Sequence, residues 1–399
     1  MTAPSPSRFS RDAQRLLALT TALARSGSRL EDIFWENQLG ALLDKILLGK
    51  KSRTLENALE HLLATDTNAY EILVEQAETL SESTTLRLKD QSWDALLFSA
   101  PIVAWTRYQL PVGTLRPAQH AQLLDQIKTH IAASGTRVAV LPQLVGFDQM
   151  PQTFQDTRAW TQRLASEALD QNGDLQGLIK SVDADSMLAD ARFVVGILVA
   201  PHGEPLFRWQ TTQDGQAASR EACREAWVEA ANPILAPLFT GCQMEYLQPD
   251  AYYVNSREAD RRIRPLALKA AVTWLHNAGP VLDQGVRAVI AACGESVIEE
   301  YRIGFSLKQS NEVIYGCVWP VLSKEEAVAD GMETGQVDVP DEIAALLKEM
   351  DVRDVRRLPG IYPAEFCDDC GAPYFPNPLG EMLHPEFPEE ADPGPIHFH

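Results

Sequence analysis

The sequence predicts an α/β (α+β) protein, and three features of its pattern carry that prediction. Leucines recur at helical spacing over the first 90 residues, the middle of the chain alternates short apolar runs with amphipathic segments, and the last part is acidic and rich in proline. The chain has 399 residues, of which 45% are hydrophobic and 23% charged, so we expect a sizeable core and two or three domains. This composition excludes disorder of the whole chain.

The pattern changes at three points and divides the chain into four regions. Residues 1–90 are expected to form a helical N-terminal layer. Residues 91–190 form a first α/β module, and residues 191–322 form a second module with an antiparallel meander. A central mixed sheet is expected from the two similar modules. Residues 323–399 form an acidic C-terminal region with a zinc knuckle.

Spacing and capping predict the N-terminal layer. Leu16, Leu19 and Leu23 lie on one helical face. Ser28 and Glu31 have the spacing of a capping box, in which each side chain accepts a hydrogen bond from a free amide at a helix start. We expect residues 9–88 to be helical throughout, as about four helices whose leucines form a bundle core.

The two modules repeat one order of elements. An apolar run over 93–105, interrupted by Pro101, is predicted as one strand or two short ones, and a strand over 193–200 opens the second module. A helix, a strand and a helix follow in each case, over 117–133, 137–142 and 153–169, and over 217–232, 242–247 and 256–277. Ala100-Pro101 and Ala200-Pro201 are expected to end equivalent strands. The repeat suggests an internal duplication, although two unrelated units of this kind would look as similar.

Three further strands are predicted over 286–293, 297–306 and 312–321, separated by turn residues. We expect this meander to extend the central sheet. A short acidic helix from Ser323 and a helix over about 340–350 then precede the proline-rich tail.

The charge of the chain limits its partners. The formal net charge is −20, which repels nucleic-acid phosphates and argues against nucleic acid as a partner. Residues 323–399 alone carry 18 acidic and 5 basic side chains. We interpret this region first as a solubilising surface, and as an alternative it could dock a basic partner protein. The pattern gives no oligomeric state.

The sequence also predicts a compartment. No run approaches the roughly 18 apolar residues of a spanning helix, and the N-terminus lacks the apolar core of a secretory signal. Six cysteines are too few for a disulfide scaffold, and four of them lie in mainly apolar surroundings, namely Cys223, Cys242, Cys293 and Cys317. We therefore expect a cytoplasmic protein with reduced cysteines and no membrane segment.

A metal site is predicted in the tail. Cys367 and Cys370 are two residues apart, and the glycine that follows allows backbone amides to point at the sulfurs, as in a zinc knuckle. Thirteen residues separate Cys370 from His384, which is expected as a third zinc ligand. The fourth ligand is left open among His397, His399, Glu381 and water. A metal-free turn is the alternative, and a redox pair fits less well because the cysteines do not follow a strand and open a helix.

Weaker candidates lie in the two modules. Arg257, Arg261 and Arg264 share one helical face, which could bind a phosphate or carboxylate but is expected to pair with the acidic C-terminal region instead. His202 lies in a turn that is predicted near a crevice between the modules. Arg107 and Tyr108 follow a strand at the same predicted crevice and could line a ligand site, or simply pack under a helix.

Three stretches of the sequence together resemble a known family. They are Ser26–Glu36 with its Phe-Trp-Glu end, Ala100–Tyr108, and the knuckle Cys367–Pro373 with His384. The chain is similar over nearly its whole length to a bacterial family known only as domain of unknown function 2863. The resemblance implies a cytoplasmic bacterial protein of about this length and implies no activity, substrate or catalytic residue.

Three function classes follow. The leading one is a non-enzymatic accessory or regulatory protein with structural zinc, because the common nucleotide-binding and hydrolase motifs are absent from the sequence. The alternative is an enzyme for a small anionic metabolite that uses Arg107, His202 and Arg257 in the crevice. The third is a metal or redox sensor that uses Cys367 and Cys370.

Overall fold

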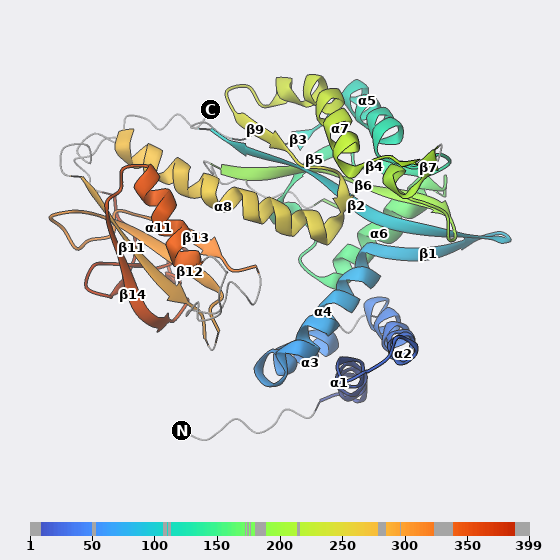
Figure 1. Ribbon diagram of the computed structural model, residues 1–399, viewed down its shortest axis with the longest axis horizontal. Helices are drawn as coiled ribbons and strands as arrows, with labels where there is room; N and C mark the ends of the chain where they lie inside the picture. Colours follow the sequence, from blue (N-terminus) through green and yellow to red (C-terminus); the bar gives the residue numbers. More distant parts are fainter. Residues whose placement is uncertain are drawn as a thin grey trace.

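A helical layer, a large sheet and a smaller sheet make up the molecule, and one long helix passes between the two sheets (Figure 1). The computed structural model describes residues 9–49, 53–106, 110, 113–171, 173, 175, 177–179, 189–213, 216–277, 285–295, 297–322 and 338–387. The structure confirms the predicted mixed α/β class. Within these ranges, no helix is long and apolar enough to cross a bilayer.

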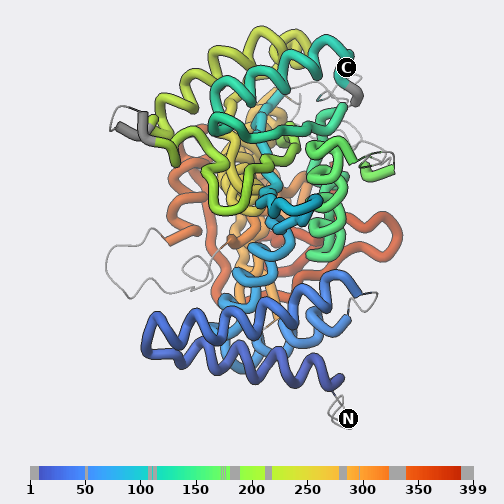
Figure 2. The backbone as a smooth tube through the Cα atoms, turned by 90° about the vertical axis from the view of Figure 1, so that its right-hand side faces the viewer, coloured from blue at the N-terminus to red at the C-terminus, as the bar shows by residue number. Residues whose placement is uncertain are grey.

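The N-terminal layer contains four helices, as predicted. They are α1 (Arg11–Ala24), α2 (Arg29–Leu47), α3 (Arg53–Thr65) and α4 (Thr67–Glu82). Ser10, Ser28 and Asp66 each accept a hydrogen bond from the amide three residues on, which fixes the starts of α1, α2 and α4. The expectation of helix throughout is wrong at the end of the layer, where β1 (Ser83–Leu88) pairs with the next strand. Figure 2 shows the layer from a second side, with α1 and α2 at the edge of the molecule.

Two long antiparallel strands form the centre of the large sheet. They are β2 (Gln91–Trp105) and β6 (Ala189–Pro201). The outer edge of β2 pairs with three strands: β1, β10 (Asp250–Ala251) and β9 (Gln243–Tyr246). The outer edge of β6 pairs with β4 (Arg137–Val140) and β5 (Gln143–Gly146). β3 (Gly113–Thr114) pairs with β5 and ends this side of the sheet. Every described pair in this sheet is antiparallel, so the sheet is not mixed as expected. An alternating pattern is the same for either strand direction, which is why the sequence does not distinguish them.

Pro101 does not break β2, although a proline inside a central strand has no amide to donate. It lies in the short gap between the residues of β2 that pair with β10 and those that pair with β9. Its carbonyl accepts a hydrogen bond of 2.9 Å from the amide of Leu247. The missing amide of Pro101 therefore costs no inter-strand hydrogen bond on the edge of β2 that faces β9 and β10, and the strand continues through this position.

Helices cover both faces of the large sheet. α5 (Pro117–His130) and α7 (Arg220–Leu235) pack on one face, where Trp227 is fully buried. α6 (Phe154–Ala168) and α8 (Tyr252–Asn277) pack on the other, around Phe193. Short elements complete this part: η1 (Phe147–Gln149), η2 (Arg208–Gln210), η3 (Ala236–Leu238) and the hairpin β7 (Thr212–Gln213) with β8 (Gln216–Ala217).

The short strands β4, β5, β9 and β10 pair with the two long strands in a two-fold symmetric way. β9, from the second module, pairs with residues 102–105 of β2, and β4, from the first module, pairs with residues 196–199 of β6. Residues 102–105 of β2 therefore correspond to residues 196–199 of β6, and by the same shift Ala100 corresponds to Val194. These two equivalent residues pair with each other at the centre of the sheet. Each module therefore gives its short strands to the long strand of the other.

This register corrects the proposed equivalence of two dipeptides. Ala100-Pro101 lies inside β2, whereas Ala200-Pro201 ends β6, and Pro201 pairs with Trp93. The two Ala-Pro pairs are therefore not equivalent. Two identical dipeptides in one sequence need not be structurally equivalent, because the position of a residue in a sheet is set by its pairing partners.

Two arginines attach the helical layer to the large sheet. Arg158 of α6 donates to the carbonyls of Leu80 and Ser83 at 2.6 and 2.5 Å and pairs with Asp44 at 2.9 Å. Arg257, in the corresponding helix α8, pairs with Glu78 of α4 at 2.6 Å. α4 is thus held by an arginine from each module.

A second, separate sheet has the order β13-β12-β11-β14. Its strands are β11 (Val286–Cys293), β12 (Glu300–Leu307), β13 (Tyr315–Pro320) and β14 (Asp354–Tyr362). The first three form the predicted antiparallel meander, and β14 joins β11 in parallel. The helix predicted over 340–350 is α11 (Val339–Glu349), and the short acidic helix expected from Ser323 lies outside the described residues.

The expectation that the meander extends the central sheet is wrong, and α8 is the reason. Its first half carries Ala259 into the core of the large sheet, and its second half carries Leu268 and Leu275 into the core of the second sheet. One helix of 26 residues is long enough to serve two cores. The meander therefore packs beyond the large sheet rather than on its edge.

Candidate metal centre

A tight turn presents the two cysteines. The amide of Cys367 donates to the carbonyl of Ala372 at 2.8 Å, and the amide of Gly371 donates back to the carbonyl of Cys367 at 2.8 Å. Gly371 has a φ of +73°, a conformation that costs other residues free energy. A bridge between Phe366 and Pro373 closes the base of the turn. The predicted knuckle is thus formed by its own backbone bonds.

A short hairpin brings His384 to the turn. It consists of β15 (Phe375–Pro376) and β16 (Met382–Leu383), which ends one residue before the histidine. In its loop, the side-chain oxygen of Asn377 accepts from the amides of Leu379 and Glu381, both at 2.9 Å. Asn377 is 1% exposed, so these bonds are shielded from water. They fix the loop and with it the position of His384.

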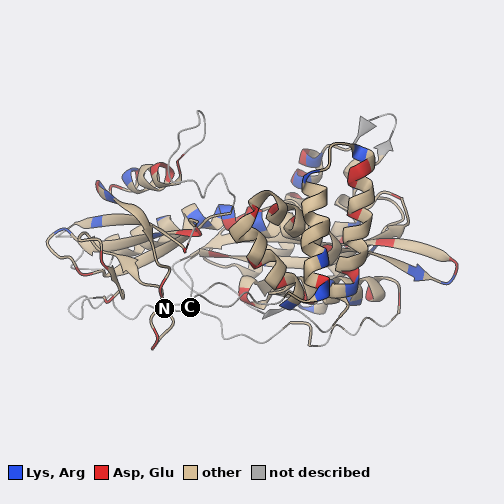
Figure 3. Cartoon of the chain, turned by 90° about the horizontal axis from the view of Figure 1, so that it is seen from below, with Lys and Arg blue, Asp and Glu red and all other residues tan. Residues whose placement is uncertain are grey.

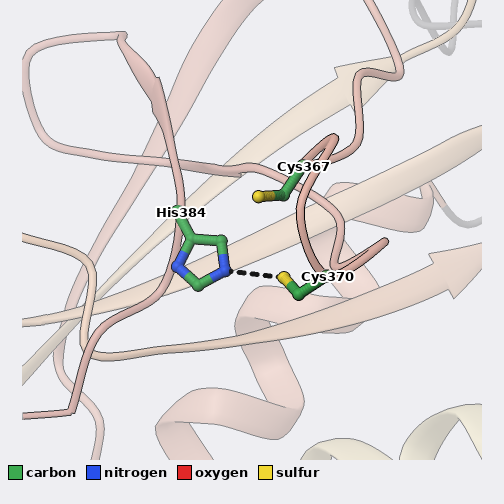
Figure 4. A group of neighbouring side chains, drawn as sticks. All are labelled: Cys367, Cys370 and His384. Atoms are coloured by element: carbon green, nitrogen blue, oxygen red, sulfur yellow. Dashed lines mark hydrogen bonds between the residues drawn. The ribbon is translucent and has the colours of Figure 1, made fainter.

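The three side chains point toward one another (Figure 4). One sulfur or nitrogen atom from each of Cys367, Cys370 and His384 lies within 4.8 Å of the others, and Cys370 Sγ is 3.1 Å from His384 Nε2. The backbone amides of Cys370 and Asp369 hold the pKa of the Cys367 thiol below its usual value. The structure therefore brings together the three residues that the sequence predicted as ligands.

The donor set fits a soft divalent ion. Two thiolates and one imidazole are ligands that zinc prefers, and the two thiolates neutralise its charge. Cys370 is exposed, while Cys367 and His384 are half-buried. Such a set could hold one ion between the turn and the hairpin.

A buried arginine anchors the site to the second sheet. Arg302 of β12 is 0% exposed, and its Nη1 donates to the carbonyls of Glu365 and Tyr374 at 2.6 and 2.8 Å. Its Nε donates to Glu300 at 2.6 Å, and its guanidinium lies 4.9 Å from the ring centre of Phe366. One side chain thus holds both ends of the cysteine turn. No motif in the sequence around Arg302 marks this residue as part of a metal site.

Two glycines let the hairpin lie directly on the sheet. A Cβ at Gly304 would lie 2.1 Å from the carbonyl oxygen of Pro376, and a Cβ at Gly316 would lie 2.3 Å from the ring of Phe375. Neither position has room for a side chain. These glycines lie within strands and not in turns, and they are required because they have no Cβ where the hairpin approaches the sheet.

A fourth ligand does not appear among the described residues. Glu381 is not in the group of ligand atoms, and its carboxylate accepts a hydrogen bond of 2.8 Å from Asn377 within the hairpin. His397 and His399 lie outside the described residues. Their role as ligands stays a prediction.

A sequence model of a protein family, described as "Protein of unknown function (DUF2863)", matches residues 1–398. The chain belongs to the DUF2863 family. No curated protein matches the chain, and no solved structure matches it. The family resemblance seen in the sequence is therefore confirmed, and the function of this DUF2863 protein has to be argued from its own residues.

His202 of the DUF2863 protein is paired rather than open to a crevice. Its Nδ1 lies 2.9 Å from both carboxylate oxygens of Asp94, and its side chain is 67% exposed. Although burial alone would raise it, the pKa of Asp94 is lowered by hydrogen bonds from His202, Gly203 and Thr85. His202 and Asp94 are thus a hydrogen-bonded pair at the surface, at the end of β6.

Arg257 and Arg261 line a polar cleft of about 590 Å³ between α7, β9 and α8. Arg261 lies 3.7 Å from Glu258, and Arg257 pairs with Glu78, so among the described residues neither pairs with the acidic C-terminal region as expected. Arg264 is also turned elsewhere, because it donates to the carbonyl of Pro320 at 2.8 Å. Acidic and basic side chains are interspersed along the helices in Figure 3.

Of the residues predicted to bind an anionic metabolite, His202 and Arg257 are described, and they do not line one cleft. His202 is not among the residues that line the cleft of Arg257 and Arg261. Arg107 and Tyr108 lie outside the described residues. In the DUF2863 protein, the metal centre is thus the predicted site whose described members meet.

Proposed function

We propose that Cys367, Cys370 and His384 bind one zinc ion with a structural role. The observation that carries the proposal is the placement of three zinc-type donor atoms within 4.8 Å, on a turn and a hairpin that separate backbone bonds have already shaped. Bound zinc supplies a cross-link between these two pieces. His397, His399 or water would complete the tetrahedral set.

A structural role is supported by what the ligands touch. None of the three lines the clefts that the described residues form around Arg257, around Phe154 or around Trp105. The chain beyond His384 continues along the second sheet, and the amide of Glu386 donates to the carbonyl of Val313, in the connection between β12 and β13, at 2.8 Å. A zinc cross-link at His384 would therefore hold this segment against the sheet.

We further propose that the protein is a non-enzymatic accessory or regulatory protein that acts through a partner protein. Support comes from the first half of α2, where Leu30, Ile33 and Phe34 share one face and are 82%, 43% and 53% exposed. Apolar side chains grouped in this way are typical of protein contact surfaces. A variant with serine at Leu30 and Phe34 is expected to lose a specific partner that the parent chain retains at ~0.15 M salt. Equal retention of that partner by the variant would argue against this surface.

Elemental mass spectrometry tests the zinc site directly. The untagged protein is expected to carry about one zinc per chain, and the double variant Cys367→Ser, Cys370→Ser about none. Cys242→Ser is the matched control, because Cys242 is a half-buried cysteine outside the group and its substitution should leave the zinc content unchanged. No zinc in the parent protein would overturn the proposal. The double variant His397→Ala, His399→Ala then distinguishes the two candidates for the fourth ligand: weaker zinc binding indicates a histidine, and unchanged zinc binding indicates water.

One observation favours redox sensing as a second candidate. Cys370 is exposed, and its sulfur lies within 4.8 Å of that of Cys367. Hydrogen peroxide would take two electrons from the two thiols, form one S–S bond and yield two molecules of water. If the protein is a redox sensor, micromolar peroxide should release zinc and form this disulfide. Zinc that stays bound under these conditions would argue against redox sensing and support only the structural role.

A further inference from the structure

A pocket whose described lining residues are all uncharged lies between the end of β2, β9 and the second half of α8. Its volume is about 440 Å³, within the usual range for small-molecule sites. The described residues that line it are Trp105, Thr106, Gly241, Gln243, Ala270, Thr273, Trp274 and Asn277. None of these is charged, in a chain where 23% of the residues are. The described lining residues therefore offer no ion pair to a phosphate or carboxylate, which would lose hydration on entry.

Two tryptophans give the pocket its aromatic wall, and each is held in place from outside. The Nε1 of Trp105 donates to Gln243 at 3.1 Å. The indole of Trp274 packs against Tyr315 and Phe387, with ring centres 5.1 and 4.8 Å away. Indole faces that are already fixed bind a flat ring by stacking without a large loss of side-chain entropy.

The polar groups of the pocket offer one donor and one acceptor with spare capacity. Gln243 uses its side-chain oxygen for Trp105, which leaves its amide nitrogen available as a donor. Asn277 uses its amide nitrogen for the carbonyl of Thr273, which leaves its side-chain oxygen available as an acceptor. A donor and an acceptor beside aromatic faces match the edge and the faces of a nucleobase.

We propose that this pocket binds an uncharged purine or pyrimidine base, presented as a free base or a nucleoside. The base stacks on Trp105 or Trp274, and its edge bonds to Gln243 and Asn277. A sugar would use the hydrogen-bonding groups but would not gain full stacking, and a nucleotide would bring a phosphate that no described lining residue can pair. The proposal does not rest on zinc binding by Cys367, Cys370 and His384, although Phe387, which packs on Trp274, is three residues beyond His384.

Titration calorimetry of the full chain with adenosine, guanosine, cytidine and uridine tests the proposal, with glucose and AMP as comparison arms. At least one nucleoside is expected to bind, and AMP is expected to bind no more tightly than adenosine. Absence of binding by all four up to roughly 5 mM would overturn the proposal. Binding of glucose alone, or binding of AMP at least tenfold tighter than adenosine, would overturn it as well.

Two variants locate the binding. Trp105→Ala is expected to weaken it about tenfold or more, since stacking on one aromatic side chain contributes roughly 1–3 kcal/mol per base. Gln243→Ala is expected to weaken it less and to remove preferences among the bases. Trp209→Phe is the control, because Trp209 stacks on Phe207, outside the pocket, and binding should not change. If Trp105→Ala keeps its cooperative thermal unfolding and binds nucleoside as well as the parent, the pocket is not the site.

Discussion

The Nη1 atom of Arg302 lies 2.8 Å from the carbonyl oxygen of Tyr374, 72 residues further along the chain. The same atom also reaches the carbonyl of Glu365, on the other side of the cysteine turn. A single buried cation therefore sets the distance between the two ends of the turn. The shape of the metal centre depends on the core of the second sheet as well as on its ligands.

We predict that Arg302→Lys weakens both the fold and the zinc site. A lysine has one ammonium group and cannot bond two carbonyls and Glu300 in the planar pattern of a guanidinium. The free energy of unfolding should fall by about 2–4 kcal/mol, and zinc affinity by about tenfold or more. Urea unfolding and competition with a chromophoric chelator measure the two effects. Arg353→Lys, at a side chain 83% exposed, is the control and should change neither.

Gly304→Ala should separate the hairpin from the sheet. The new Cβ would lie 2.1 Å from a backbone oxygen of Pro376, which cannot rotate away as a side chain could. We expect a loss of about 2 kcal/mol or more in the free energy of unfolding and a lower zinc affinity. Gly27→Ala, where nothing lies within 4 Å of the added carbon, should be close to neutral. Similar stability of the two variants would contradict the contact between Gly304 and the hairpin.

Removal of zinc should be visible at Trp274. Phe387, which packs on this indole at 4.8 Å, is three residues beyond His384. When a chelator frees His384, Phe387 should leave the indole and tryptophan emission should change. Trp274→Phe should abolish this change, while Trp93→Phe, in the large sheet, should retain it. An unchanged spectrum on complete removal of zinc would contradict the link.

Stability should depend on pH through Glu82. Burial raises the pKa of this carboxyl to about 7, while the amide of Tyr253 and the charge of Arg257 lower it and Glu78 and Asp250 raise it. Because the pKa is higher in the folded than in the unfolded state, the folded protein binds more protons, and stability falls as pH rises from about 4.5 to 7. Glu82→Gln keeps an acceptor for Tyr253 but cannot ionise. Relative to the parent, the variant should gain about 2 kcal/mol between pH 5 and pH 8 in urea unfolding. A constant difference across this range would show that Glu82 does not titrate as expected.

The features that the sequence predicted correctly are local ones. The cysteine turn needs only two thiols, their spacing and Gly371, and the start of α2 needs only a capping side chain. His384 was found because the span from Cys370 suits a small zinc module. Such features depend only on residues that are close together in the sequence, so they can be predicted without knowledge of the fold.

The features that were missed depend on distant pairing. Arg302 acts on carbonyls 63 and 72 residues away, and nothing in its own neighbourhood marks it as part of the site. β1 follows α4 without a break, so only its pairing with β2 shows that Ser83–Leu88 is extended. The separation of the second sheet follows from the way α8 packs, which its length alone does not show.

The symmetric pairing of β4 and β9 limits how the molecule could have been assembled. A chain with one long strand, its short strands and its helices could not complete its own sheet, since its short strands belong on the other long strand. Two copies of such a half-length chain would complete each other through the same contacts. The two modules are thus paired as the subunits of an intertwined homodimer would be, and the antiparallel contact of Ala100 with Val194 lies on the local two-fold axis that relates them.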